Sequence, residues 1–174
     1  QGTGIEKITI GNFDTDATGE TTFDATLLND SLATVGLSSS SATGDTTFSG
    51  MTSIVGAEMK NGAGDMTIAY TATVVAGTAD SQSVEISNVS AGTFTSNSIE
   101  TINVNTSLVK STVDNVASDA LKTLNVTGNV DLTISNAVDF VAGTNNDTTI
   151  DATIDASAFT GKLTVTADTN DHAI

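Results

Sequence analysis

The sequence predicts an all-β protein in which short parallel strands stack as a β-solenoid, and three observations support this fold class. The 174 residues are rich in Thr, Val, Ile, Gly, Asn and Asp and contain no Pro, Cys or Arg. Thr, Val and Ile favour strands, whereas Gly, Asn and Asp favour turns. Two short motifs also recur along the chain at intervals of about 20 to 25 residues, which is the length of one solenoid coil.

The first motif combines a small turn residue, an acid, two variable residues and a large apolar residue. Its copies are 19–23 (GETTF), 44–48 (GDTTF), 64–68 (GDMTI), 146–150 (NDTTI) and 170–174 (NDHAI). We predict that each copy forms one corner of a coil, with the acid facing water and the apolar residue entering the core. The glycines of these corners, Gly44 and Gly64 among them, are expected to adopt positive φ.

The second motif reads apolar, charged, polar, apolar, polar, apolar. It occurs at 5–10 (IEKITI), 99–104 (IETINV) and 121–126 (LKTLNV). Its last two apolar positions are two residues apart, as on the inward face of a strand. Stacked coils about 4.8 Å apart would align these residues into a continuous interior. A sandwich of short strands is the alternative fold, because its turns also recur regularly.

The remaining elements follow from local patterns. Residues 66–75 form a continuous β-favouring run, 83–89 alternate in polarity, and a break near Gly128 divides the segment 121–134 into two strands. Further strands are expected over 21–28, 148–154 and 162–166, with a loop over 38–43. Residues 107–120 are expected to form a short amphipathic helix, because Val109, Val113, Val116 and Ala120 recur every three or four positions.

The organisation along the chain predicts one continuous fragment of a larger protein. The regular 22-residue spacing starts near Asn97, so we expect a less regular β region over 1–97 and a solenoid-like region over 98–174. The first residue is Gln and no signal peptide is visible, which favours a processed or excised segment.

The charge balance excludes several classes of function. The chain has 21 acids and five basic residues, a net charge of −16, so nucleic acid is not an expected partner. No apolar run approaches the ~20 residues that a membrane-spanning helix needs, so membrane insertion is not expected. An enzyme is not expected either. The single histidine, His172, lies near the last residue, and a polysaccharide-cleaving β-helix would require an acid–base set that the sequence does not indicate.

Calcium is the cofactor that the sequence favours, because three acidic stretches gather carboxylate, amide and backbone oxygens. The candidate ligands are Asp14, Asp16 and Glu20 in the first stretch, Asn146, Asp147, Asp151 and Asp155 in the second, and Asp168, Asn170 and Asp171 in the third. Stacking would bring acids of successive corners together, where a cation would relieve their repulsion. The alternative is that these residues form turns in which their side chains cap their own backbone.

Several segments resemble Gram-negative surface-layer proteins, which are type I-secreted and related to repeats-in-toxin proteins. They are "SIETINVNTS", "LKTLNVTGNVDLTISN", "AGTNNDTTIDA" and "IDASAFTGKLTVTADTNDHAI". The resemblance implies an extracellular location on the bacterial cell surface, self-assembly into a lattice, calcium binding, and anchoring to lipopolysaccharide through regions outside this chain. The chain departs from the repeats-in-toxin pattern because it lacks tandem Gly-Gly-x-Gly-x-Asp nonapeptides, so a tandem calcium roll is not expected.

The expected function is therefore that of a structural segment of a secreted surface-layer protein, which assembles with copies of itself into a calcium-stabilised lattice. The alternative is a binding module of a large secreted adhesin that recognises a glycan or a host surface. One Tyr, six Phe and no Trp offer few rings on which a sugar could stack, which weighs against this alternative.

Overall fold

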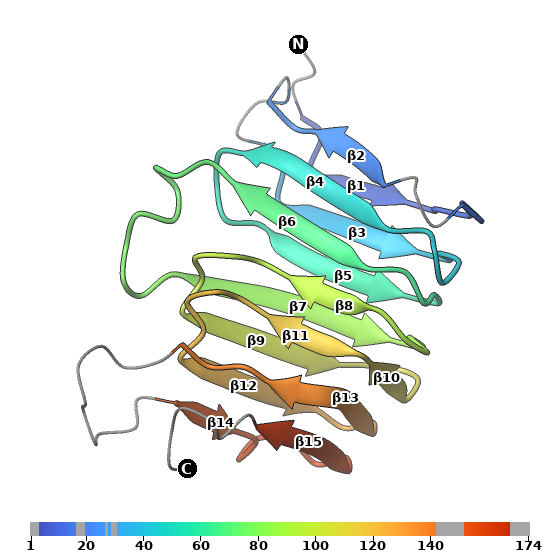
Figure 1. Cartoon of the computed structure of the whole chain (residues 1–174), viewed down its shortest axis with the longest axis vertical. Helices are drawn as coiled ribbons and strands as arrows, with labels where there is room; N and C mark the ends of the chain where they lie inside the picture. The colour runs from blue at the N-terminus through green and yellow to red at the C-terminus, as the bar shows by residue number, and fades with distance from the viewer. Residues whose placement is uncertain (1–3, 17–19, 27, 29–30, 142–151, 168–174) are drawn as a thin grey trace.

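The computed structural model describes residues 4–16, 20–26, 28, 31–141 and 152–167 of the chain. These residues form 15 strands in three parallel sheets and contain no helix, and thus none that could cross a membrane. The strands lie one above another along the long axis of the molecule (Figure 1). The all-β solenoid prediction is confirmed, and the sandwich alternative is wrong because the paired strands of the described residues run parallel.

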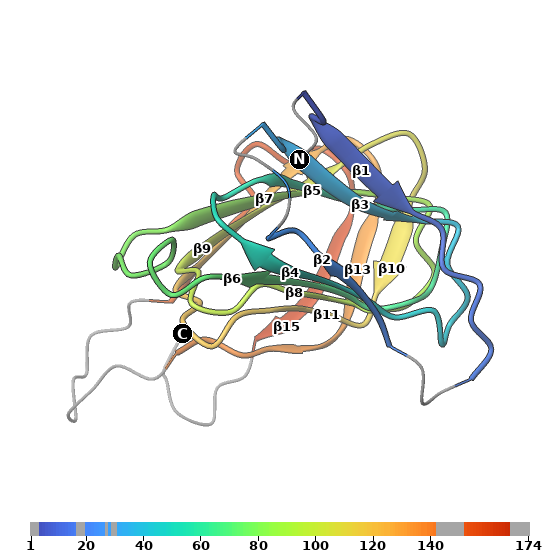
Figure 2. The same cartoon turned by 90° about the horizontal axis from the view of Figure 1, so that it is seen from above.

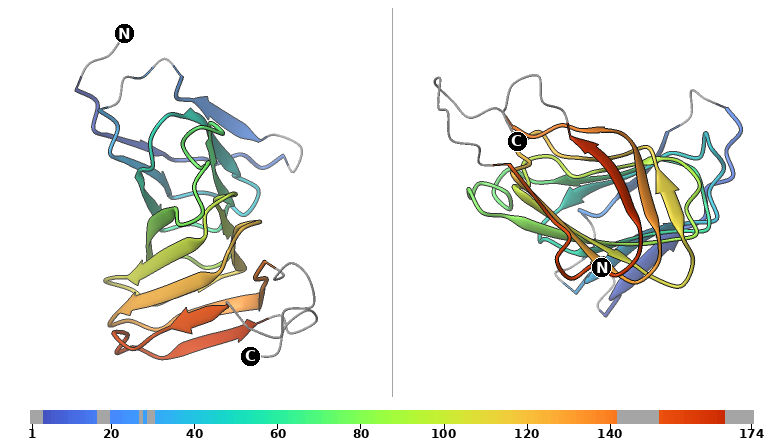
Figure 3. Two further views of the ribbon diagram at one scale, coloured as in Figure 1. Left: turned by 90° about the vertical axis from the view of Figure 1, so that its left-hand side faces the viewer. Right: turned by 90° about the horizontal axis from the view of Figure 1, so that it is seen from below.

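The first sheet has seven strands and extends through the whole stack. In spatial order they are β1 (Lys7–Ile10), β3 (Thr34–Ser38), β5 (Gly56–Lys60), β7 (Ser81–Ser87), β9 (Thr101–Thr106), β12 (Thr123–Gly128) and β14 (Thr153–Asp155). Strand β7 pairs with β9 along its length, so the sheet continues past residue 97 without interruption. The side view in Figure 3 shows these strands as successive rungs.

The second sheet faces the first across the core, and a third sheet closes one side of the later coils. The second consists of β2 (Thr21–Asp24), β4 (Thr46–Met51), β6 (Met66–Tyr70), β8 (Thr93–Thr95) and β11 (Asn115–Ala117). The third consists of β10 (Ser111–Val113), β13 (Leu132–Val138) and β15 (Leu163–Ala167). Figure 2 shows β10 and β13 crossing between the other two sheets. Each coil is thus one circuit of the chain around a shared interior.

The described residues of the first three copies of the pentamer motif stack in register, as predicted. Phe23 pairs with Phe48, and Phe48 pairs with Ile68. The ring centroids of Phe23 and Phe48 are 6.0 Å apart in a tilted arrangement, and Phe48 and Ile68 are fully buried. The motif therefore marks one apolar column of the core. Its copies at 146–150 and 170–174 lie outside the described residues.

The second motif also marks equivalent positions. Thr101 pairs with Thr123, and Val104 pairs with Val126, so the two copies coincide residue by residue in β9 and β12. The apolar column to which Val104 and Val126 belong continues through Val84 and Ala57 to Val35, all of them buried. Parallel in-register pairing of similar residues thus builds the core that a single coil cannot form alone.

The helix predicted over 107–120 is wrong. This segment forms β10 and β11, which belong to different sheets and are separated by a corner at Asp114. Val113 ends one strand and Val116 lies in the next, and both point into the core with no exposed surface. Their spacing of three residues arises because the chain turns between them, not because it winds as a helix.

The expected role of the corner glycines is also wrong. Positive φ is adopted by Gly92 and Gly128, but not by Gly44 or Gly64. A Cβ atom on Gly44 would lie 2.2 Å from the carbonyl oxygen of Asn12, which is closer than any side chain could approach. These corners therefore contain glycine because the backbones of successive coils touch there.

A buried polar network interrupts the apolar interior. Gln82 has no exposed surface, and its side-chain amide donates to the carbonyl oxygens of Val55 at 2.7 Å and Ser83 at 2.8 Å. The hydroxyl of Tyr70 donates to the side-chain carbonyl of Gln82, and the Val55 amide donates to that hydroxyl at 3.3 Å. This network connects β6 and β7 on either side of the loop 71–80.

Candidate functional sites

At the described start of the first predicted calcium stretch, side chains bond to the backbone. The carboxylate of Asp14 accepts the amide of Asp16 at 2.8 Å, and the Asn12 side chain accepts the amide of Asp14 at 3.1 Å. The hydroxyls of Ser41 and Thr43 donate to the Asp14 carbonyl oxygen, the latter at 2.7 Å. The third candidate of this stretch, Glu20, is exposed immediately before β2.

The second predicted stretch is described only at its end. The carboxylate of Asp155 accepts the amide of Ser157 at 2.8 Å, and hydrogen bonds from the backbone and hydroxyl of Ser157 lower the pKa of Asp155. The other predicted ligands, Asn146, Asp147, Asp151, Asp168, Asn170 and Asp171, lie outside the described residues. Within the described ranges, no three His, Cys, Asp or Glu side chains are grouped so as to hold a metal ion. Calcium binding therefore stays a prediction.

A different set of acids connects successive coils at the corner before the second sheet. Asp45 accepts the amide of Asp65 at 2.9 Å, Asp65 accepts the amide of Thr93 at 2.7 Å, and Asp114 accepts the amide of Gly92 at 3.2 Å. Each carboxylate thus caps a backbone donor of an adjacent coil. The pentamer motif indicated the acids at 45 and 65, but sequence reasoning assigned them to solvent and did not include them among the ligands.

The acids of this corner also influence one another. Burial raises the pKa of Asp65, the hydrogen bond from Thr93 opposes that rise, and the negative charges of Asp45 and Asp114 add to it. The corner therefore concentrates negative charge while its hydrogen bonds hold the coils in register.

The outer face of the first sheet contains an alternating charge network. Lys7 contacts Glu58 at 2.6 Å, while Lys60 lies 3.4 Å from Glu58 and 3.1 Å from Glu85. Glu58 and Glu85 are paired directly across β5 and β7, so Lys60 separates two like charges on neighbouring strands. The network accounts for two of the five lysines and is a structural feature of this face.

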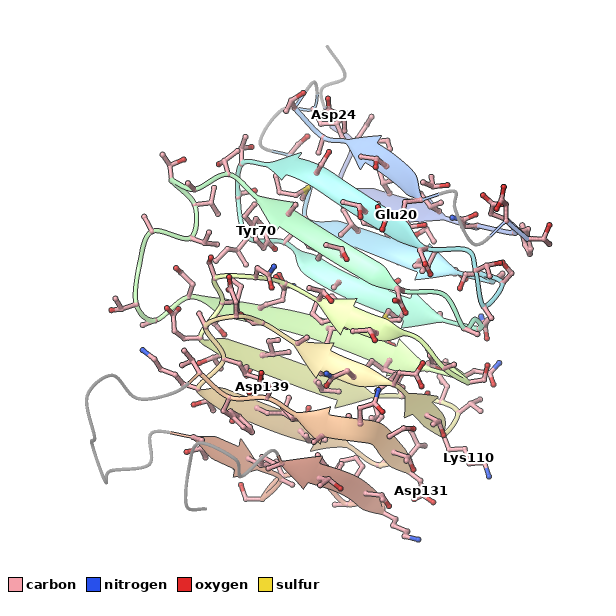
Figure 4. All side chains as sticks on the ribbon, viewed as in Figure 1. Glu20, Asp24, Tyr70, Lys110, Asp131 and Asp139 are labelled. Atoms are coloured by element: carbon pink, nitrogen blue, oxygen red, sulfur yellow. The ribbon has the colours of Figure 1, made fainter. Side chains whose placement is uncertain are left out.

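A polar cleft of about 410 Å³ lies beside the third sheet. Lys110, Asp131 and Lys162 line it, each at the position just before β10, β13 or β15 begins. The Asp131 carboxylate accepts the backbone amide of Lys162 at 2.9 Å. Figure 4 shows Lys110 and Asp131 together at this edge of the stack. The cleft carries two cations and one anion, so it is locally cationic on a strongly acidic chain.

Three threonines on neighbouring strands also line this cleft. Thr112 pairs with Thr133, and Thr133 pairs with Thr164, so the three threonines occupy equivalent positions in β10, β13 and β15. Sequence reasoning missed the cleft because Lys110 and Lys162 are distant in the chain. Each of these lysines precedes a short β-favouring segment, and this was the signal in the sequence. The third sheet, which aligns the two segments, was not predicted.

Comparison with protein-family models, with curated proteins and with solved structures finds no match for this chain. The parallel solenoid is therefore established by the strand pairings themselves. The relation to surface-layer proteins, export and calcium binding stay predictions from the sequence. Of the residues considered for catalysis, His172 lies outside the described residues.

Proposed function

We propose that this chain is a structural segment of a secreted bacterial surface-layer protein, and that its activity is association with further copies into a lattice on the cell surface. The observation that carries the proposal is the uninterrupted seven-stranded sheet from β1 to β14. A continuous parallel stack keeps corners on successive coils at fixed positions relative to one another. Such regular spacing is what a repeating lattice contact requires.

Calcium is the proposed support for this assembly. A net charge of −16 makes approaching copies repel, and corner acids such as Asp45 and Asp65 concentrate that charge along one edge. Divalent cations bound by surface oxygens would screen this repulsion and bridge neighbouring copies. Attachment to lipopolysaccharide is assigned to regions of the protein outside this chain.

The experiment is a calcium titration of the purified chain, followed by light scattering and negative-stain electron microscopy. We expect ordered two-dimensional sheets and a higher Tm in calcium, with reversal of both effects by a chelator. Sodium chloride at matched ionic strength is the control for simple screening. If calcium changes neither Tm nor particle size, the proposed calcium-dependent assembly is wrong.

A glycan-binding adhesin module is the second candidate, because the cleft beside the third sheet offers hydroxyls and two ammonium groups. A carboxylated sugar would match this chemistry through hydrogen bonds from threonines and charge pairing with lysines. Saturable binding of such a sugar to a chain that stays monomeric would favour this candidate over lattice formation.

A further inference from the structure

The two most exposed large apolar side chains of the described residues lie in opposite electrostatic settings. Leu108 is 83% exposed and comes two residues before Lys110, beside the cationic cleft. Phe13 is 71% exposed and is followed directly by Asp14. Exposed apolar groups next to charges of opposite sign are typical of surfaces that contact each other.

The turn that carries Phe13 is held firmly by the stack. Asn12 is buried, and its side-chain amide donates to the carbonyl oxygen of Asp45 at 2.8 Å and to the hydroxyls of Thr21 and Thr46. The bonds to the backbone of Asp14 described above fix the other side of the turn. Phe13 is therefore presented on an ordered turn, which lowers the entropy that docking would cost.

The segment beside the cleft is also held in an unusual conformation. Leu108 has φ of 58°, a left-handed value that bulky residues rarely adopt, and Val109 is 45% exposed. The Val109 carbonyl accepts the amide of Asn88 at 3.2 Å, so the segment is tied to the preceding coil. Strain and apolar exposure coincide at the rim of the cleft, and neither is accounted for by packing within the described residues.

The ammonium groups of the cleft are available to form ion pairs with a partner. Lys7 and Lys60 are already paired with Glu58 and Glu85. Lys110 and Lys162, in contrast, form no ion pair with any described residue. On a chain of charge −16, a second copy supplies acidic turns in abundance.

We propose that the cleft receives the turn 12–16 of a second copy of this chain. The ring of Phe13 packs against Leu108 and Val109 of the neighbour, and the acids that follow it approach Lys110 and Lys162. The turn and the cleft are different surfaces, so copies docked head to tail form a heterologous contact in which each added copy leaves a free turn and a free cleft for the next. This inference rests on the proposed self-association and names the surfaces that perform it.

Sedimentation velocity of the full chain across a concentration series, with and without calcium, tests this contact. Phe13→Ser and Lys110→Glu should each weaken association by about tenfold or more, because each removes one half of a central contact. Lys122→Glu is the matched control, since it makes the same charge change outside the cleft and should associate as the wild type does. Circular dichroism and Tm establish that each variant folds.

A charge exchange provides the second measurement. Asp16→Lys should weaken association alone, and an equimolar mixture of Asp16→Lys with Lys110→Glu should associate more strongly than either variant by itself. If wild type assembles but Lys110→Glu behaves as Lys122→Glu does, the cleft is not the contact, although lattice formation stands. If the wild type stays monomeric under all conditions, both proposals are wrong.

A sugar acid is the competing occupant of the cleft, and glucuronate is the probe for it. We expect glucuronate to leave association unchanged at millimolar concentration. Saturable glucuronate binding that Lys110→Glu abolishes, together with association that this variant does not affect, would overturn the docking proposal and favour a glycan-binding cleft.

Discussion

A Cβ atom placed on Gly64 would lie 2.4 Å from the carbonyl oxygen of Gly44, so these two corners meet backbone to backbone. The same contact recurs one coil further, where a Cβ on Gly92 would lie 2.5 Å from the oxygen of Gly64. A column of glycines thus determines how closely successive coils approach at this edge.

Replacing Gly64 with Ala is expected to lower the free energy of unfolding by about 1–3 kcal/mol, because the backbones must separate to admit a methyl group. Urea denaturation measures this change. Gly56→Ala is the control, since its nearest atoms would be 3.5 Å away, an ordinary contact distance. Equal effects of the two substitutions would contradict the close-contact explanation.

Phe48 is the centre of the apolar column in the first coils, with no exposed surface. Phe48→Ala is expected to cost about 3–5 kcal/mol of stability, because it removes a buried ring and leaves a cavity between two paired neighbours. Phe13→Ala, at a 71% exposed position, should leave the stability of the monomer nearly unchanged. Thermal unfolding of both variants at low protein concentration makes the comparison.

The single tyrosine provides a titration that reports on the core. Burial raises the pKa of Tyr70 to about 12, and the hydrogen bond with Val55 opposes this rise only in part. The ultraviolet absorbance change on ionisation should therefore centre near pH 12 in the folded chain. A midpoint near the ordinary value of 10 would show that Tyr70 is not buried against β7.

The same shift has a consequence for stability. The pKa of Tyr70 is higher in the folded state than in the unfolded state. The contribution of Tyr70 to the free energy of unfolding is therefore complete below pH 10 and is lost as the pH rises from 10 to 12. Tyr70→Phe should reduce the slope of stability against pH in that window. It should also lower stability at neutral pH by about 1–2 kcal/mol, because the Gln82 side-chain carbonyl loses its donor.

Lys60 contacts both Glu58 and Glu85, which are paired on neighbouring strands, so without Lys60 the repulsion between the two carboxylates is no longer compensated. The Ser107 hydroxyl and the adjacent Lys60 lower the pKa of Glu85. The contribution of Glu85 to stability is therefore present above the ordinary glutamate pKa and is lost as the pH falls through the pKa of Glu85 in the folded state. Lys60→Met should destabilise the chain by roughly 0.5–1 kcal/mol at neutral pH and low salt.

The pH dependence of this variant distinguishes charge from packing. The difference in stability between Lys60→Met and the wild type should shrink as the pH falls through the folded pKa of Glu85, and also in high salt. Lys122→Met controls for the loss of one positive charge. A difference that persists unchanged at low pH would mean that Lys60 acts through its aliphatic stem.

The sequence predicted the parts of the fold that depend on repetition. Phe23, Phe48 and Ile68 are alike because they occupy the same position on successive coils, so a repeated motif reports their stacking directly. Strands β3 and β5 were not predicted. Their glycines and the charged residues of β5 resemble loop composition, and only pairing within the stack makes them strands.

Features that depend on corners were less predictable. Val113 and Val116 imitate a helical period because a turn separates them, and a linear pattern carries no sign of that turn. The cleft residues Lys110 and Lys162 come together only through the third sheet, whose existence follows from the direction in which each corner bends. The burial of Gln82 was likewise not predictable from local sequence, because its partners Val55 and Tyr70 lie 27 and 12 residues earlier in the chain.

Within the described residues, each strand of the long sheet pairs in that sheet only with the rungs before and after it, as β9 pairs with β7 and β12. No contact along this sheet depends on the total number of rungs. Gain or loss of one circuit by duplication or deletion would therefore alter the height of the molecule while its cross-section stays the same. The length of such a segment can therefore change during evolution by one coil at a time, without compensating changes in the other coils.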